Sequence, residues 1–257
     1  AGGAEGGSPV IGTLFQRFAL LSLSGSMVLL PLLLFAGLIQ RRYRAQSCAV
    51  LWLWLALAGW LGFGAVFTAA LALLLPIALS GGIHLDGFCD TCDALASHQD
   101  RARKLEILKD SHAGAFAIIM GCSYFVLALG VWSEMDLKVL PVAGLIFVVS
   151  RTLSSLALST FPKANKSGSL SMFSDAAQKR ILLITLALWL IVCAGVGICL
   201  DWKQTILLFV TAAVVYGSYY RLAMKQFGGT TGDIAGFFTQ ICELACAFVI
   251  MLGGKLL

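Results

Sequence analysis

Charged side chains are scarce in this sequence. Of its 257 residues only 12% are charged and 59% are hydrophobic, whereas a soluble domain has about 25% charged residues. Apolar runs recur that are long enough to cross a bilayer, which takes about 20 residues in a helix. This scarcity excludes an ordinary soluble domain and predicts a polytopic protein of the lipid bilayer. The net charge of +5 is interpreted as loop charge that sets orientation, and we expect no nucleic-acid partner.

Other common features are missing as well. Residues 1–10 are Gly-rich, without a basic stretch or an initial Met, so no secretory signal is predicted and they are interpreted as a tail or a cloning remnant. The eight cysteines lack the spacing of a disulfide framework and are interpreted mostly as packing residues. No internal repeat is evident. We therefore expect residues 11–257 to form a single integral membrane domain.

The apolar runs predict the spans. They cover 11–39, 48–79, 114–132, 139–160, 181–200, 204–222 and 236–252. At about 1.5 Å per residue, the stretch 48–79 is much longer than one crossing of about 30 Å requires. Basic residues flank both of its ends, so we expect an even number of crossings there, with a turn at 60–64. The predicted fold is an all-α transmembrane helix bundle of seven or eight spans, with a broken or re-entrant segment before residues 81–95.

Basic residues indicate which loops share a side. They are Arg41, Arg42 and Arg44; Arg101, Arg103, Lys104 and Lys109; Lys163, Lys166, Lys179 and Arg180; and Arg221 and Lys225. By the positive-inside rule these loops face the cytoplasm, whereas 133–136 and 201–204 face outside. The predicted location is the cell (inner) membrane, with multiple passes, and both polar motifs described next lie on the cytoplasmic side.

The stretch GGIHLDGFCDTCDAL, residues 81–95, concentrates acid in this apolar chain. Asp86, Asp90 and Asp93 have the spacing i, i+4, i+7, which on a helix places them within an arc of about 60°. Three unpaired carboxylates at bilayer depth would cost about 8–10 kcal/mol, so we expect a water-filled cavity and a neutralising divalent cation. Carboxylates without His partners suit Mg²⁺, which proteins hold with one or two carboxylates plus substrate phosphates.

Two other interpretations of this stretch remain. One is a solvated acidic helix end. The other is a soft-metal site of His84, Cys89 and Cys92. It is disfavoured because His84 points away from the aspartates on a helical wheel, Cys92 lies well off their face, and no second CxxC pair exists.

Polar residues elsewhere could complete the site. In LEILKDSHAG, residues 105–114, Lys109 could meet a phosphate and Asp110 could join the metal site. Alternatively, Asp110 or Ser111 is the N-cap of the next span. Arg151 lies within an apolar segment, so it is expected to face the bundle interior and pair with an anion, either a substrate or a structural acidic partner.

The stretch FGGTTGDIAGFFTQICEL, residues 227–244, is the second informative motif. A Gly-rich turn that leads into a helix N-terminus favours anions, because free N–H groups and the helix dipole point at the ligand. Asp233 could cap this helix or bind a metal that bridges to the anion. Glu243 lies deeper in the apolar helix and is a site candidate for that reason.

Taken together, HLDGFCDTCD (84–93), LEILKDSHAG, Ser150–Arg151, GGTTGD (228–233) and Glu243 resemble the cobalamin synthase family, over about residues 30–250 in order and spacing. The resemblance implies an adenosylcobinamide-GDP ribazoletransferase of late vitamin B12 assembly. Such enzymes join adenosylcobinamide-GDP to α-ribazole, or its 5′-phosphate, release GMP and need Mg²⁺. The sequence leaves a homo-oligomer open.

These lines of reasoning give the expected site. The expected catalytic residues are Asp86, Asp90, Asp93, Lys109 and Arg151; the expected substrate-binding residues are His84, Ser111, Gly228, Gly229, Thr231, Gly232 and Glu243; and the expected metal ligands are Asp86, Asp90, Asp93, Asp110 and Asp233. The chain departs from the family pattern at 18–25, which lacks Phe-x-Thr-Arg-x-Pro, and at Ala94, His112 and Asn165.

Two other functions remain as alternatives. A lipid-directed CDP-alcohol phosphotransferase usually has Ala-Arg after its first Asp-Gly pair, which is absent here. An ion-coupled transporter more often has two halves with matching broken helices, and the sequence shows no such halves.

Overall fold

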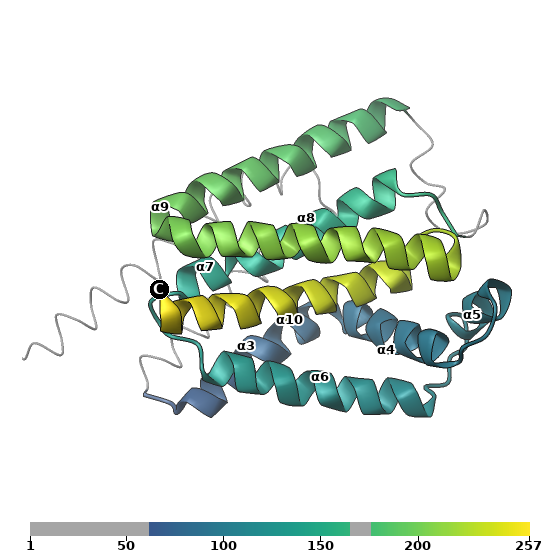
Figure 1. Ribbon diagram of the computed structural model, residues 1–257, viewed down its shortest axis with the longest axis horizontal. Helices are drawn as coiled ribbons and strands as arrows, with labels where there is room; N and C mark the ends of the chain where they lie inside the picture. The colour runs from purple at the N-terminus through teal and green to yellow at the C-terminus, as the bar shows by residue number, and fades with distance from the viewer. Residues whose placement is uncertain (1–61, 165–175) are drawn as a thin grey trace, which may run out of the picture. The chain divides into compact units, whose positions relative to one another are not determined.

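The computed structural model describes residues 62–164 and 176–257 (Figure 1). The chain divides into two compact units, 1–76 and 77–257. Within the first unit the structure describes only 62–76, most of which belongs to helix α3 (Ala65–Ser80). The predicted span at 11–39 and the first part of 48–79 lie outside the described residues. Both polar motifs belong to the second unit.

The second unit is helical in its described residues. Its elements are α4 (Ile83–Ala96), α5 (Arg101–Ile107), α6 (Ala115–Ser133), α7 (Leu140–Ala143), α8 (Leu145–Thr160), α9 (Ala176–Leu222), the π-helix η2 (Ala223–Phe227) and α10 (Gly232–Leu256). Among the described residues, four helical stretches are long and apolar enough to cross a membrane, or five if α3 and α4 form one broken span. The predicted polytopic α-helical fold with a broken segment is confirmed, whereas the predicted number of seven or eight spans is not.

Helix α9 is continuous in sequence but contains a sharp break. Asp201 has extended backbone angles (φ −158°, ψ 106°). Its Oδ1 accepts hydrogen bonds from the backbone N–H groups of Lys203 (2.9 Å) and Gln204 (3.1 Å), as an N-cap does. The two halves of α9 run back beside each other in Figure 1. They correspond to the separate spans predicted at 181–200 and 204–222.

Helix α10 is the central helix of this unit. It packs against α4, α8 and α9. In the most apolar 18-residue stretch of α10, 67% of the residues are buried, whereas 17% are buried in the corresponding stretch of α9. Ile234, Ala247 and Ile250 are fully buried on α10, whereas Ile191 and Val214 of α9 point outward. Outward apolar side chains suit contact with lipid, since the bilayer core is as apolar as the helices themselves.

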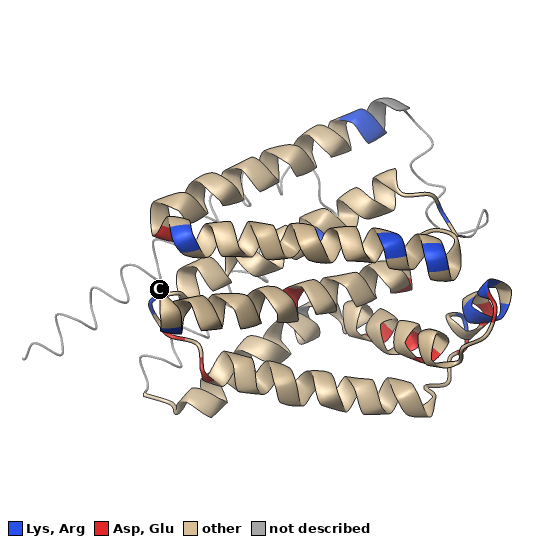
Figure 2. Ribbon diagram, in the orientation of Figure 1, with Lys and Arg blue, Asp and Glu red and all other residues tan. Residues whose placement is uncertain are grey.

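The two ends of the second unit differ in their basic residues. The basic segments of α5 and of the C-terminal end of α9 lie together at one end in Figure 2. At the other end, Lys255 pairs with Glu134 and thereby ties the end of α10 to the end of α6. This separation agrees with the loops that the positive-inside rule assigns to opposite sides.

Candidate active site

Helix α4 presents the acidic motif. It begins directly after Gly81 and Gly82, which both have positive φ (67° and 77°) and break the chain after α3. Because 83–96 is helical, Asp86, Asp90 and Asp93 lie on one face, as the spacing predicted. The side chain of Asp86 is exposed and those of Asp90 and Asp93 are half-buried.

The second motif crosses this helix at very close range. A Cβ atom at Gly87 would lie 2.7 Å from the Cα of Asp233, and one at Gly236 would lie 3.0 Å from the carbonyl oxygen of His84. Two glycines thus let α4 and α10 touch backbone to backbone, the packing that small residues permit between membrane helices. The stacked rings of Phe88 and Phe237 (centroids 5.6 Å apart) support the crossing. Motifs almost 150 residues apart in the chain therefore share one site.

The carboxylates of this site repel one another. Asp90 interacts electrostatically with Asp86, Asp233, Asp93 and Asp110. Among the residues the structure describes, no salt bridge joins Asp86, Asp90 or Asp233 to a lysine or arginine. The described part of the chain contains no preassembled group of three His, Cys, Asp or Glu side chains around a metal position. The cluster is thus an open set of oxygen donors whose negative charge the described residues leave uncompensated.

Asp93 differs from the other two aspartates of α4. Its Oδ2 accepts a hydrogen bond from the backbone N–H of Gly114 (2.6 Å), and its Oδ1 accepts one from that of Ala117 (2.9 Å). These are orphan N–H groups at the start of α6, so Asp93 caps α6 from a neighbouring helix. The alternative that Asp110 or Ser111 is this N-cap is wrong, because α6 begins after Gly114.

The loop between α5 and α6 carries the remaining polar residues of the first motif. Lys109 and Ser111 are exposed. Asp110 Oδ1 accepts a hydrogen bond from the backbone N–H of His112 (3.0 Å) and contacts the His112 ring Nδ1 (2.8 Å). The hydrogen bond from the His112 side chain lowers the pKa of the Asp110 carboxyl group. Asp110 therefore remains an anion, and its charge acts on Asp90.

The Gly-rich turn is held by residues 161–164. Thr230 donates its backbone N–H to Pro162 O (2.8 Å), and Thr230 O accepts from the N–H of Ala164 (3.1 Å). A Cβ atom at Gly229 would lie 2.6 Å from Pro162 O, so only glycine fits at this position. The Thr230 hydroxyl also hydrogen-bonds the buried Tyr219 hydroxyl. The turn is thus fixed on both sides.

Thr231 begins α10 as its N-cap. Its Oγ1 accepts a hydrogen bond from the backbone N–H of Ile234 (3.3 Å). The alternative that Asp233 is the cap is wrong, since Asp233 lies within the first turn. The carboxylate of Asp233 lies within 3.5 Å of the Thr231 hydroxyl. Gly232 is exposed beside it. The cap leaves Asp233 available to a ligand.

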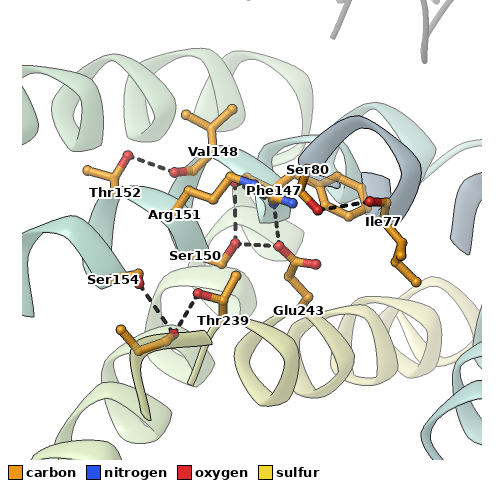
Figure 3. Close-up of polar contacts among 11 residues, drawn as sticks. Ile77, Ser80, Phe147, Val148, Ser150, Arg151, Thr152, Ser154, Thr239 and Glu243 are labelled. Carbon is orange, nitrogen blue, oxygen red and sulfur yellow. Dashed lines mark hydrogen bonds and ion pairs between the residues drawn. The ribbon is translucent and has the colours of Figure 1, made fainter. Parts of the chain in front are cut away.

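Arg151 and Glu243 form an ion pair in the bundle (Figure 3). Glu243 is buried and also accepts a hydrogen bond from the Ser150 hydroxyl (2.9 Å). Arg151 donates to the carbonyl oxygen of Phe147 (3.2 Å), and its guanidinium lies 5.6 Å from the Phe147 ring centroid. The pair joins α8 to α10. The alternative of a structural acidic partner for Arg151 is therefore present in the structure.

Sequence reasoning missed the contacts of α5. It counted Arg101 and Lys104 only as loop charge, yet Lys104 is buried and its Nζ donates to Gln226 Oε1 (2.6 Å). Arg101 Nε donates to the carbonyl oxygen of Lys225 (3.3 Å). No local pattern signals these contacts, because their partners lie more than 120 residues away in the π-helix η2.

Among His84, Cys89 and Cys92, the thiols are free and His84 faces the crossing with α10.

Comparison with known proteins identifies the family. Residues 45–251 match the family model described as cobalamin-5-phosphate synthase. The chain belongs to this family. A protein of Lachnoclostridium phytofermentans named adenosylcobinamide-GDP ribazoletransferase is 42% identical over 192 residues, which are 75% of this chain and 74% of that protein. Proteins of the same name from Desulforamulus reducens (31% over 199 residues; 72% and 74%) and Clostridium acetobutylicum (32% over 187 residues; 72% and 71%) are also similar. No solved structure matches the chain significantly.

Membership in the cobalamin-5-phosphate synthase family makes the chain a transferase of cobalamin biosynthesis. The matched range contains α4, the α5–α6 loop and the turn before α10. The family match does not favour the two alternatives that the sequence left, a lipid-directed phosphotransferase and a transporter.

Proposed function

We propose that this cobalamin-5-phosphate synthase family member joins adenosylcobinamide-GDP to α-ribazole or α-ribazole 5′-phosphate and releases GMP. The relatives' shared name implies both types of substrate. The observation that carries the proposal is the crossing at Gly87 and Asp233, which brings the acidic face of α4 and the Gly-rich turn before α10 together. The reaction requires a binding place for a diphosphate beside a binding place for a hydroxyl nucleophile. The acidic face of α4 and the Gly-rich turn, lying together, suit these two requirements.

We propose Mg²⁺ as the cofactor, held by Asp86, Asp90 and Asp233 with Asp110 nearby. The donors are oxygens only, they repel one another, and no described cation pairs with the first three. This donor set fits a hard cation that takes one or two carboxylates together with phosphate and water oxygens. When bound, Mg²⁺ would neutralise charge on the diphosphate. Asp93 contributes by capping α6, which fixes α4 against that helix.

The remaining residues bind and orient the substrates. A ribose hydroxyl other than the 5′-hydroxyl, whose oxygen carries the phosphate in α-ribazole 5′-phosphate, forms a new bond to the phosphorus that carries cobinamide. The bond from that phosphorus to the GMP oxygen breaks, and a carboxylate such as Asp90 accepts the hydroxyl proton. Exposed Lys109 reaches a phosphate from the α5–α6 loop. The turn at Gly228, Gly229 and Gly232 offers backbone N–H groups to an anion.

Arg151 and Glu243 serve this site as positioning residues. Each is engaged by the other, and Glu243 is buried. His84 interacts electrostatically with Arg151, and its backbone touches Gly236 at the crossing. The pair therefore holds α8 on α10, the helix that α4 crosses.

The function is tested with purified protein, adenosylcobinamide-GDP, α-ribazole or its 5′-phosphate, and Mg²⁺. GMP should appear in equal amount to the cobalamin product, and a chelator should stop its release until Mg²⁺ is restored. Absence of GMP with both acceptors would contradict the proposal. Activity that survives chelation would contradict the metal site alone.

We also propose that the site faces the cytoplasm of the cell membrane, where nucleotide substrates are made. Cysteine introduced at Ser97, Gln226 or Ser133 in a background without native cysteines tests this with an impermeant thiol reagent. In intact cells Ser133→Cys should react at once, and the other two should react only after the membrane is opened. Reaction of Ser97→Cys or Gln226→Cys from outside would contradict the assignment.

A further inference from the structure

Lys104 is a buried cation without a carboxylate partner in the described structure. Its relative exposure is 7%. Its Nζ donates to the neutral side chain of Gln226, and no ion pair joins it to an acid within 62–164 or 176–257. Burying an ammonium group is costly unless an anion pairs with it. An ammonium has three N–H donors, so two of them remain for another acceptor.

Arg101 lies one turn before Lys104 on α5 and reaches the same segment. Its Nε donates to the carbonyl oxygen of Lys225, and a Cβ atom at Gly228 would lie 3.6 Å from its NH1 atom. The residue is exposed. Arg101 is therefore exposed to solvent beside Gly228. This residue has a φ of +76° and ends the π-helix where the Gly-rich motif begins. A π-helix within an α-helix is frequently found at functional sites.

We propose that Lys104 and Arg101 bind a phosphate group of a substrate beside the Gly228 turn. This inference rests on the proposed function for the identity of the substrates. The two cations lie on one side of α5, and Gly228 supplies a surface without a side chain beside Arg101. An entering phosphate would provide the anion that Lys104 lacks among the described residues. A guanidinium and an ammonium together suit a phosphate oxyanion.

The phosphate has two sources in the proposed reaction. The acceptor carries a monoester when it is α-ribazole 5′-phosphate, and the donor carries a diphosphate. Arg101 and Lys104 contact residues 225–228 before the turn, whereas Gly87 of α4 meets α10 at Asp233, after the turn. The cation pair and the aspartates of α4 thus contact different parts of this segment, and we assign the acceptor monoester to the cation pair.

Binding to the full-length protein in detergent tests the proposal without requiring turnover. Dissociation constants are measured by calorimetry for α-ribazole 5′-phosphate, α-ribazole, GMP and inorganic phosphate. Lys104→Met should weaken binding of α-ribazole 5′-phosphate roughly 10- to 100-fold, the scale of a lost charge-assisted hydrogen bond. It should change binding of α-ribazole less than twofold. Exposed Arg101→Met should show the same selectivity with a smaller loss, roughly 3- to 10-fold.

Matched controls separate binding from a structural role. Arg103→Met removes an equal charge from α5, but Arg103 is exposed and pairs with Glu106, so it should leave all four constants unchanged. Gln226→Ala removes the structural contact of Lys104 and keeps the cation, so selectivity for the phosphorylated acceptor should persist.

The outcomes are distinct. Weakened binding of GMP in Lys104→Met, with the acceptor unaffected, would support the site and assign it to the donor. Equal weakening of phosphorylated and unphosphorylated acceptor in both Lys104→Met and Arg101→Met, or no weakening of any phosphate ligand, would overturn the inference. Failure of the proposed function would instead appear as absence of GMP release by the unaltered protein.

Discussion

Two groups of charged residues lie in this bundle, and they are neutralised in different ways. On α8 and α10, Arg151 and Glu243 pair directly, and Ser150 adds a hydrogen bond to the carboxylate. On α4, Asp86 and Asp90 face other carboxylates and no described lysine or arginine pairs with them. Both groups are polar in a chain that avoids charge. Only the first is complete within the described structure.

This difference distinguishes charged residues that hold helices together from charged residues that can bind a ligand. A buried charge is tolerated in a membrane protein when it is paired, and the pair on α8 and α10 meets that condition without a ligand. The acidic face of α4 meets it only when a cation arrives. The acidic face of α4 is therefore the better candidate for chemistry. The Arg151–Glu243 pair is the better candidate for holding helices in place.

The largest expected effect comes from Asp90, at the centre of the repelling cluster. We expect Asp90→Asn to reduce kcat by at least about 100-fold, the scale of losing one electrostatic contact to a transition state. Its thermal stability should not fall, because the change removes repulsion. Asp86→Asn should behave alike. Asp136→Asn at the opposite end of the bundle is the matched control and should keep full activity.

The next effect concerns the paired group. Glu243→Leu should destabilise the protein by about 3–5 kcal/mol, because it leaves Arg151 without its partner. The double variant Arg151→Met with Glu243→Leu should regain most of that stability and most of the activity. Thermal unfolding in detergent and GMP release measure the two. A stable but inactive double variant would show that Arg151 touches substrate, and the comparison drawn above would break.

A smaller effect is expected where the two motifs cross. Gly87→Ala places a Cβ atom 2.7 Å from the Cα of Asp233, a backbone atom that cannot yield easily. We expect a loss of about 1–3 kcal/mol, as for other overpacked sites, and lower activity because α4 moves away from Asp233. Gly130→Ala is the control, since nothing lies within 4 Å of its Cβ position. Equal effects of both substitutions would argue against the close crossing.

The sequence predicted much of this arrangement because its signals are local or periodic. Apolar length predicted α6, α8, both halves of α9 and α10 to within a few residues, and the i, i+4, i+7 spacing predicted the common face of the aspartates. What it could not predict depends on tertiary contacts. The cap of α6 is supplied by Asp93 from another helix, and the partner of Lys104 lies 122 residues away. Neither contact leaves a pattern near its own residue.

The smallest predicted effect distinguishes Asp93 from its neighbours on the same face. Both of its oxygens accept hydrogen bonds from the start of α6, so Asp93→Asn should cost about 1 kcal/mol of stability, as the loss of a helix cap does. If Asp93 acts only as a cap, the Mg²⁺ concentration that gives half-maximal activity should be unchanged in this variant. In Asp86→Asn it should rise several-fold, because that residue is proposed as a ligand. Titration of activity with Mg²⁺, beside thermal unfolding, measures both. A parallel rise in both variants would make Asp93 part of the metal site, and the acidic face of α4 would then act as one unit of three carboxylates.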